Sequence, residues 1–107
     1  MKIFISIPMN GLFEEDIKRE FRGISEVLPF PKDEIEIIDT WINEVPPTDF
    51  HGDTGLWYLA KSIELLAQAD MVVMASGWEN ARGCIIEHEC AKEYGIPILD
   101  NLKYSIF

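Results

Sequence analysis

The chain has 107 residues, of which 48% are hydrophobic and 26% are charged. This length and balance favour a single globular domain over residues 1–107 and argue against a disordered chain. The net charge of −10, from 19 acidic and 9 basic side chains, argues against general binding to nucleic-acid polymers, because such a surface repels a phosphate backbone. No apolar run approaches the roughly 18 residues of a membrane span, and no signal-peptide cleavage site follows the apolar N-terminus. We therefore expect a cytoplasmic protein with no membrane partner.

Strand-like and helix-like patterns alternate along the chain. The predicted elements, in chain order, are a strand at 2–7, a helix at 13–28, a strand at 34–39, a helix at 56–66, a strand at 71–75, a helix at 83–94 and a strand at 96–99. The apolar stripes behind the first two helices are Phe13, Ile17, Phe21, Ile24 and Leu28, and Leu56, Leu59, Ile63 and Leu66. Gly95 is interpreted as the stop of the third helix. Residues 101–107 are interpreted either as a short edge strand or as a partner contact.

This alternation predicts an α/β fold, because right-handed crossovers between parallel strands place helices on both faces of one sheet. We expect a three-layer Rossmann-like or flavodoxin-like architecture with four or five parallel strands in the order 2-1-3-4(-5). Ligands bind such sheets beyond the carboxyl ends of the strands, where the strand order reverses. The predicted crevice therefore lies between strands one and three, with residues 6–11 on one wall and residues 75–78 on the other.

Residues 40–55 show no clear periodicity and are long for a connection in a compact domain. They form either a lid or subunit contact, or a tolerated surface insertion. His51 within them would act as a general acid if the segment closes over the crevice, and the alternative is a solvent-exposed side chain. We also predict a homo-oligomer, because aromatic anchors are enriched at interfaces. The aromatic residues expected to be exposed for this purpose are Trp41, Phe50, Trp57 and Tyr58.

One carboxylate is placed close to the predicted crevice. Glu87, Ala91 and Gly95 are spaced by four residues and are expected to line one face of their helix. Small residues below the acid let the helix approach the sheet and direct the carboxylate inward, while Gly83 leaves room for a ligand at the helix start. The alternative is a solvated glutamate paired with a neighbouring base such as Arg82 or Lys92. Spacing alone leaves both interpretations open.

Three sequence features occur together: the opening KIFISIPMNG, the strand ADMVVM, and the spacing Gly83-x-x-x-Glu87-x-x-x-Ala91-x-x-x-Gly95-x-Pro97. With the order of elements, they resemble the nucleoside 2-deoxyribosyltransferase superfamily, and more closely its short, mostly uncharacterised branch. Known members transfer or hydrolyse 2-deoxyribose at its bond to a nucleobase, and some prefer nucleoside 5′-monophosphates. The resemblance implies that Glu87 is the catalytic nucleophile and that the partner is a small nucleoside or nucleotide.

A carboxylate suits this reaction, because it can capture C1′ of the sugar in a covalent glycosyl-enzyme that water or a second base resolves. Backbone amides in the first strand–helix turn and around Arg82 would hold a phosphate. The expected substrate-binding residues are Ser6, Asn10, Gly11, Ser76, Gly77, Trp78, Asn80, Arg82 and Gly83. For Ser6 and Asn10 the alternative is ordinary turn and capping chemistry. Trp78 either stacks on a base, covers the core or anchors an interface.

The sequence departs from the family pattern at three positions near the acid. Phe4 replaces a tyrosine whose hydroxyl orients the nucleophile in relatives, and Ile7 replaces a glycine and narrows the crevice. Ala81 replaces a polar residue that contacts the sugar, for which Asn80 or Ser76 would compensate. Two alternatives to an enzyme therefore stay open: a non-catalytic nucleotide-binding module that senses or sequesters a nucleotide, and a purely structural oligomerisation domain.

The remaining candidates for special chemistry are two cysteines and a histidine on the Glu87 helix. Cys84 and Cys90 are six residues apart, on different sides of the helix, so neither a disulfide between them nor a joint metal site is expected. Both are interpreted as buried free thiols. His88 faces a different direction from Glu87. We expect no metal site and no cofactor.

Overall fold

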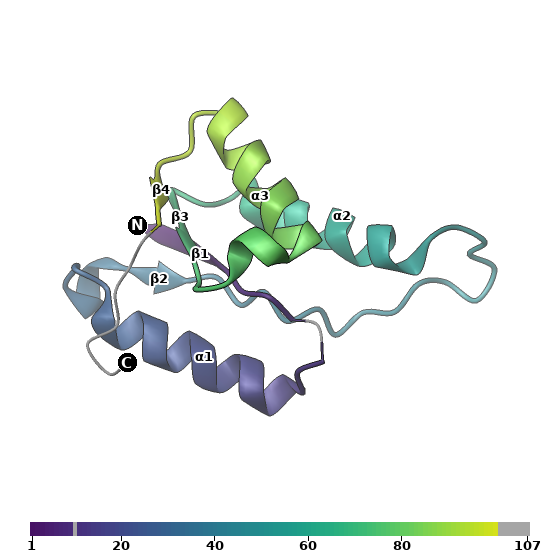
Figure 1. Cartoon of the computed structure of the whole chain (residues 1–107), viewed down its shortest axis with the longest axis horizontal. Coiled ribbons are helices and arrows are strands. Elements are labelled where there is room, and N and C mark those ends of the chain that lie inside the picture. Colours follow the sequence, from purple (N-terminus) through teal and green to yellow (C-terminus); the bar gives the residue numbers. More distant parts are fainter. Residues whose placement is uncertain (10, 101–107) are drawn as a thin grey trace.

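Four parallel strands form one sheet in the order β2-β1-β3-β4. The structure, a computed structural model, describes residues 1–9 and 11–100 (Figure 1). Its elements are β1 (Lys2–Ser6), α1 (Glu14–Val27), the 3-10 turn η1 (Lys32–Glu34), β2 (Glu36–Ile37), α2 (Thr54–Leu66), β3 (Met71–Met74), the 3-10 turn η2 (Trp78–Asn80), α3 (Arg82–Glu93) and β4 (Ile98–Leu99). The predicted α/β fold and strand order are confirmed. The residues considered for a fifth strand, 101–107, lie outside the described range.

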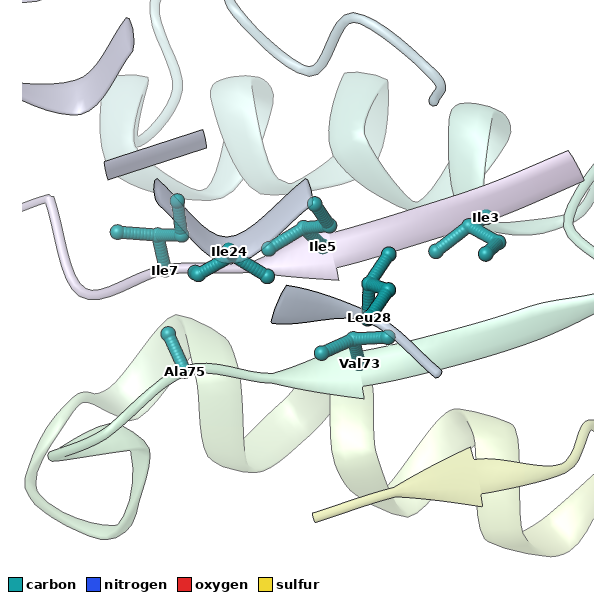
Figure 2. Packing of buried hydrophobic residues seen from close by; sticks show 7 residues of the cluster. All are labelled: Ile3, Ile5, Ile7, Ile24, Leu28, Val73 and Ala75. Atoms are coloured by element: carbon teal, nitrogen blue, oxygen red, sulfur yellow. The ribbon is translucent and has the colours of Figure 1, made fainter. Parts of the chain in front are cut away.

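The alternation of side chains along β1 separates the two faces of the sheet, because successive residues of a strand point to opposite sides. On one face, isoleucines of β1 and its continuation pack with β3 and with the apolar stripe of α1 (Figure 2). This cluster consists of Ile3, Ile5, Ile7, Ile24, Leu28, Val73 and Ala75. The helix α1 therefore forms one outer layer, and the sheet forms the middle layer (Figure 1).

The opposite face of the sheet is covered by α2 and α3 (Figure 1). The cluster there contains Phe4, Ile38, Leu66, Val72, Met74, Cys84 and Ala91. Phe4 belongs to this face because it alternates with the isoleucines that face α1. The same alternation sends Ser6, two residues further along β1, toward α2 and α3. A polar group is thereby placed on the buried face at the carboxyl end of a central strand.

Two residues assigned to buried stripes are instead exposed. Phe13, at 80% exposure, precedes the first turn of α1, and its backbone N–H donates to Asp16 Oδ2 at 3.1 Å. Leu56, at 64% exposure, lies in the first turn of α2, at the end of that helix that extends away from the sheet (Figure 1). Both predictions were wrong because the apolar spacing continues past the point where the sheet can cover it.

The third helix ends close to its predicted stop. Gly95 has a φ of +72°, in the left-handed region that favours glycine, and so it terminates α3. It is exposed in the following turn and does not share the buried face of Glu87 and Ala91, which corrects that part of the prediction.

Both edge strands, β2 and β4, are shorter than predicted. Among the helices of the described residues, none combines the length and apolar character needed to cross a membrane.

Candidate active site

Glu87 lies on the buried face of α3, with only 7% of its surface exposed. Ser6 Oγ donates a hydrogen bond to Glu87 Oε1 at 2.6 Å, and Ser62 Oγ donates one to Glu87 Oε2 at 2.6 Å. Hydrogen bonds of this length from a hydroxyl to a carboxylate are charge-assisted and strong. No ion pair of Glu87 with Arg82 or with Lys92 is found in the described part of the chain. The alternative of a solvated, ion-paired glutamate is therefore wrong.

Each serine reaches Glu87 because of its position in its own element. Ser6 ends β1 on the sheet face that α2 and α3 cover. Ser62 lies three residues after Leu59 and four before Leu66, so it faces inward on α2. The carboxylate is thus held from two sides by two different elements. Its orientation depends on how the sheet, α2 and α3 pack together.

Burial raises the pKa of Glu87 above its usual value, because a charged carboxylate is poorly solvated in this position. The hydrogen bonds from Ser6 and Ser62 oppose that shift by stabilising the charged form. The carboxylate of Glu87 is therefore largely shielded from water, but it still receives two hydrogen bonds. Such a group is more nucleophilic than a fully hydrated one, provided that it is ionised.

The thiol of Cys84 lies one turn before Glu87 on α3 and is also buried. Burial raises the pKa of Cys84 to about 11, an effect that Ser6 partly offsets and that the neighbouring Glu87 charge increases. The thiol is therefore neutral near pH 7 and lacks the thiolate character of a reactive cysteine. Both cysteines are free, and Cys84 is buried as predicted, whereas Cys90 is only half-buried, which corrects its predicted burial.

A cavity of about 920 Å³ opens beside Glu87, within the size range of small-molecule sites. Residues from four stretches line it: 4–9 at the end of β1, 40–42 after β2, 53–62 at the start and middle of α2, and 80–87 at the start of α3. Most of the lining is apolar. Besides Glu87, the polar side chains on the wall are Thr40, Asp53, Tyr58, Ser62, Asn80 and Arg82. Asp53 is already engaged, since its Oδ1 accepts from Leu56 N at 2.9 Å as the N-cap of α2.

The cavity brings together some of the predicted site residues and not others. Asn80, Arg82, Gly83 and Glu87 line it, and Ser6 lies behind the wall in contact with Glu87. Four predicted residues do not line the cavity: Gly11, Ser76, Gly77 and Trp78. Asn10 lies outside the described residues. The cavity therefore lies against the start of α3 and the face of α2, and not against the predicted crevice wall at 75–78.

Trp78 is half-buried and packs against the core cluster beneath α2 and α3. Its indole also stacks on the imidazole of His88, with ring centroids 4.3 Å apart and an angle of 13° between the planes. This arrangement matches the interpretation of Trp78 as a cover over the core.

No group of three or more histidine, cysteine, aspartate or glutamate side chains in the described ranges could hold a metal ion.

The irregular segment 40–55 contributes to the cavity at both of its ends. Trp41 and Tyr58 line the wall, whereas Trp57 packs edge-on against Tyr58 with ring centroids 5.1 Å apart. All four aromatic residues predicted to be exposed are half-buried, so their predicted exposure is corrected. His51 is exposed and does not line the cavity. Whether the segment acts as a lid or a subunit contact stays a prediction.

Two functional candidates escaped the sequence analysis. Ser62 interrupts an apolar helical face, between Leu59 and Leu66, and this interruption was the available signal. Thr40 follows the buried Ile38 at the two-residue spacing of a strand, with exposed Asp39 between them. Thr40 is 3% exposed and lines the cavity, and its Oγ1 has no hydrogen-bond partner in the described residues. Ser62 is thus marked by its place on an apolar helix face, and Thr40 by its spacing from Ile38 beyond the end of β2.

Comparison with known proteins identifies a family. The chain belongs to the family described as domain of unknown function (DUF4406), which matches residues 1–100. A solved structure described as a conserved protein from Enterococcus faecalis V583 is similar, with a TM-score of 0.61 and 19% sequence identity. The similarity covers 92% of this chain and 61% of that one, so this chain spans under two thirds of the length of the solved protein. No curated protein matches. These comparisons establish the family and the fold.

Proposed function

We propose that this member of the DUF4406 family acts on 2-deoxynucleosides or their 5′-monophosphates, cleaving the N-glycosidic bond or transferring the deoxyribosyl group. Glu87 is the nucleophile. One observation carries the proposal: a buried carboxylate, held by Ser6 and Ser62 at 2.6 Å each, lies on the wall of a cavity of about 920 Å³. The resemblance to the nucleoside 2-deoxyribosyltransferase superfamily, whose nucleophile matches position 87, supports the same assignment.

The reaction proceeds by two displacements at C1′ of the sugar. A carboxylate oxygen of Glu87 forms a bond to C1′ while the C1′–N bond breaks. The electron pair of that bond leaves with the base, which takes a proton from water. Water or a ring nitrogen of a second base then attacks C1′ and gives up its proton to solvent. The electron pair of the C1′–O bond returns to Glu87, and the carboxylate is regenerated.

The two serines replace the orienting hydroxyl that Phe4 cannot provide. Phe4 is fully buried beneath α2 and α3, and its ring offers no hydrogen bond to the acid. Ser6 and Ser62 each donate to one oxygen of Glu87, so the carboxylate is oriented without a tyrosine. A buried carboxylate without such donors would be protonated at a higher pH and would be a weaker nucleophile.

The other two departures from the superfamily pattern leave the cavity open. Ile7 is buried against the α1 face of the sheet, and the cavity persists beside it. Ala81 leaves the position of the sugar-contacting residue apolar, but the neighbouring Asn80 lines the cavity and offers an amide. Ser76, the other residue considered as a substitute, does not line it. Asn80 is therefore the better candidate for contact with the sugar.

A 5′-phosphate would find its donors at the start of α3. Arg82 and Gly83 line the cavity, and Arg82 is the only lysine or arginine on its described wall. The residue before the helix, Ala81, provides no side-chain cap, which leaves the first backbone amides of α3 available to an anion. These donors support a monophosphate despite the net charge of −10.

A nucleotide-binding module without catalysis is the second candidate. Both oxygens of Glu87 already accept a short hydrogen bond, and burial raises the pKa of the group. A carboxylate held in this way could serve to recognise a sugar hydroxyl instead of attacking C1′. The two candidates are separated by measuring whether the protein turns over a substrate and whether that turnover requires Glu87.

Release of free base from a panel of 2-deoxynucleosides and their 5′-monophosphates tests the proposal. The parent protein should release base, and Glu87→Ala should abolish the release. Glu89→Ala is the matched control, because it removes an exposed carboxylate two residues away on the same helix. Binding without release in the parent and in Glu87→Ala would favour the binding module. If the protein neither binds these compounds nor releases base from them, both candidates are overturned.

A further inference from the structure

The hydroxyl of Thr40 is the one buried side-chain polar atom without a partner in the part of the chain that the structure describes. The residue is 3% exposed and follows β2, on the side of the sheet that faces the cavity. Valine has nearly the same shape and would leave no polar group to satisfy. A buried hydroxyl without a partner is destabilising, so an unpaired one at a cavity wall points to use in the bound state.

The strand order places three polar features side by side above the carboxyl edge of the sheet. Thr40 follows β2, Ser6 and the Glu87 that it contacts lie above β1, and the loop after β3 leads to Arg82 and Gly83. Because the order is β2-β1-β3, the carboxylate lies between the other two features. Neighbouring strands are about 4.8 Å apart, so the row has the dimensions of a nucleotide.

This order orients the substrate. If C1′ lies at Glu87 and the phosphate side of the sugar faces Arg82, the base extends toward β2. The wall there is formed by Thr40, Trp41 and Ile42, and Tyr58 of α2 also lines the cavity. Aromatic and apolar side chains suit the faces of a planar heterocycle. The buried Thr40 hydroxyl, which has no partner among the described residues, suits a polar atom on the edge of the ring.

We infer that Thr40 reads the nucleobase: its hydroxyl forms a hydrogen bond with a polar atom on the edge of the base, which lies against Trp41. This inference rests on the proposed function. One staggered step about χ1 moves the hydroxyl of threonine to the position of the methyl group, and the methyl group to that of the Cβ hydrogen, so Oγ1 changes direction without backbone movement. A site built around a hydrogen bond rejects analogues that lack the matching group, and Thr40 thereby sets base preference.

The test combines two measurements on Thr40→Val in the full chain. The first is the melting temperature of the free protein, which should rise by roughly 4–8 °C, because the variant removes an unsatisfied buried hydroxyl. The second is affinity for a panel of 2′-deoxynucleosides, measured by calorimetry in a Glu87→Gln background that prevents turnover. The panel includes a purine deoxynucleoside without exocyclic groups. Affinity should fall about 5- to 10-fold, and only for the bases that the parent prefers.

Two control variants make the result specific. Thr40→Ser keeps the hydroxyl and should keep the base preference of the parent. Thr48→Val makes the same chemical change at an exposed position of the same irregular segment, and should alter neither measurement. A variant that is more stable and less selective is the expected outcome for Thr40→Val.

The opposing outcomes separate this inference from the proposed function. Unchanged affinities for every base in Thr40→Val would overturn the inference and leave Glu87 chemistry intact. A melting temperature that is unchanged or lower would show that the hydroxyl already has a partner, and would also overturn it. Absence of binding to the whole panel, in the parent background as well, would overturn the proposed function and the inference together.

Discussion

Ser62 Oγ on α2 lies 2.6 Å from Glu87 Oε2 on α3 and donates a hydrogen bond to it. The two residues are 25 positions apart in the sequence, so their contact connects α2 with α3. It lies at the wall of the cavity. Together with Ser6 on the other oxygen, it fixes the direction of a buried carboxylate. In the proposed reaction, the orientation of the nucleophile therefore depends on α2 as well as on α3.

Removing either serine hydroxyl should weaken the nucleophile. In Ser6→Ala and Ser62→Ala, one oxygen of Glu87 loses a donor that stabilises its charge, so its pKa rises further. A hydrogen bond to a charged group contributes about 1.5–3 kcal/mol, which predicts a roughly 10- to 100-fold fall in kcat/KM for each variant.

The pH profile distinguishes this effect from general damage. The acidic limb of kcat/KM should move to higher pH in both serine variants, while Ser25→Ala, which removes a hydroxyl from α1, should leave the profile in place. An acidic limb that stays fixed in Ser62→Ala would contradict the assigned contact.

Replacing Glu87 by glutamine should change how stability depends on pH. Burial raises the folded-state pKa of Glu87, so the folded protein binds a proton more readily than the unfolded chain. Ionisation of Glu87 therefore lowers the free energy of unfolding as the pH rises from the unfolded pKa through the folded one. Below both pKa values this penalty is absent.

Glutamine carries no charge, and it offers an acceptor to one serine and a donor to the other. The free energy of unfolding of Glu87→Gln, relative to that of the parent, should increase as the pH rises from about 4, the usual pKa of glutamate, through the raised pKa of the folded protein. Urea unfolding across this range measures it. A difference in the free energy of unfolding that is constant with pH, or that shrinks as the pH rises, would show that burial does not disfavour the charged form of Glu87.

Gly83→Ala should separate stability from function. A methyl group added there would lie 3.9 Å from Leu59 Cδ1, an ordinary contact, so the helix accommodates it. Alanine in place of glycine within a helix stabilises by about 0.5–1 kcal/mol. The same methyl group narrows the cavity where the substrate approaches the start of α3, and a small misplacement there lowers kcat/KM by about 10- to 100-fold. Unchanged kinetics would place the substrate elsewhere in the cavity.

The thiol of Cys84 should be unreactive although it lies on the cavity wall. Burial raises its pKa to about 11, so very little thiolate exists at pH 8. In a Cys90→Ser background, alkylation of the folded protein by iodoacetamide at that pH should be about 100-fold slower than that of the unfolded chain. Rapid labelling would mean that the helix around Glu87 is open to solvent.

The order of strands and helices could be predicted because the pattern of apolar residues changes clearly between period two and helical period. The spacing of Glu87 from Ala91 allowed an inward carboxylate but left a solvated, ion-paired one open, and the structure places both residues on the buried face. Helix ends were less predictable. Phe13 and Leu56 continue an apolar pattern beyond the region that the sheet covers. The spacing of apolar residues does not show where that covered region ends.

The partners of Glu87 were harder to predict than the acid itself. Ser6 was selected as a contact for substrate, whereas it donates to Glu87. Ser62 was missed because a serine on an apolar helix face has many harmless explanations, and only tertiary packing brings it to α3. Thr40 was missed because the segment 40–55 shows no periodicity of its own, and only its two-residue spacing from Ile38 marks it as inward. The wall at 75–78 was favoured by the position of the strand ends, but the cavity follows α2 and α3 instead.

The configuration at C1′ of the product tests the double displacement at Glu87 most directly. Turnover of a 2-deoxynucleoside with methanol as acceptor gives a methyl deoxyriboside that does not interconvert between anomers, so proton NMR reads its configuration. Two successive inversions predict retention of the β configuration, with no product from Glu87→Gln. An inverted α product, or product formed by the Glu87→Gln protein, would contradict the assignment of Glu87 as nucleophile.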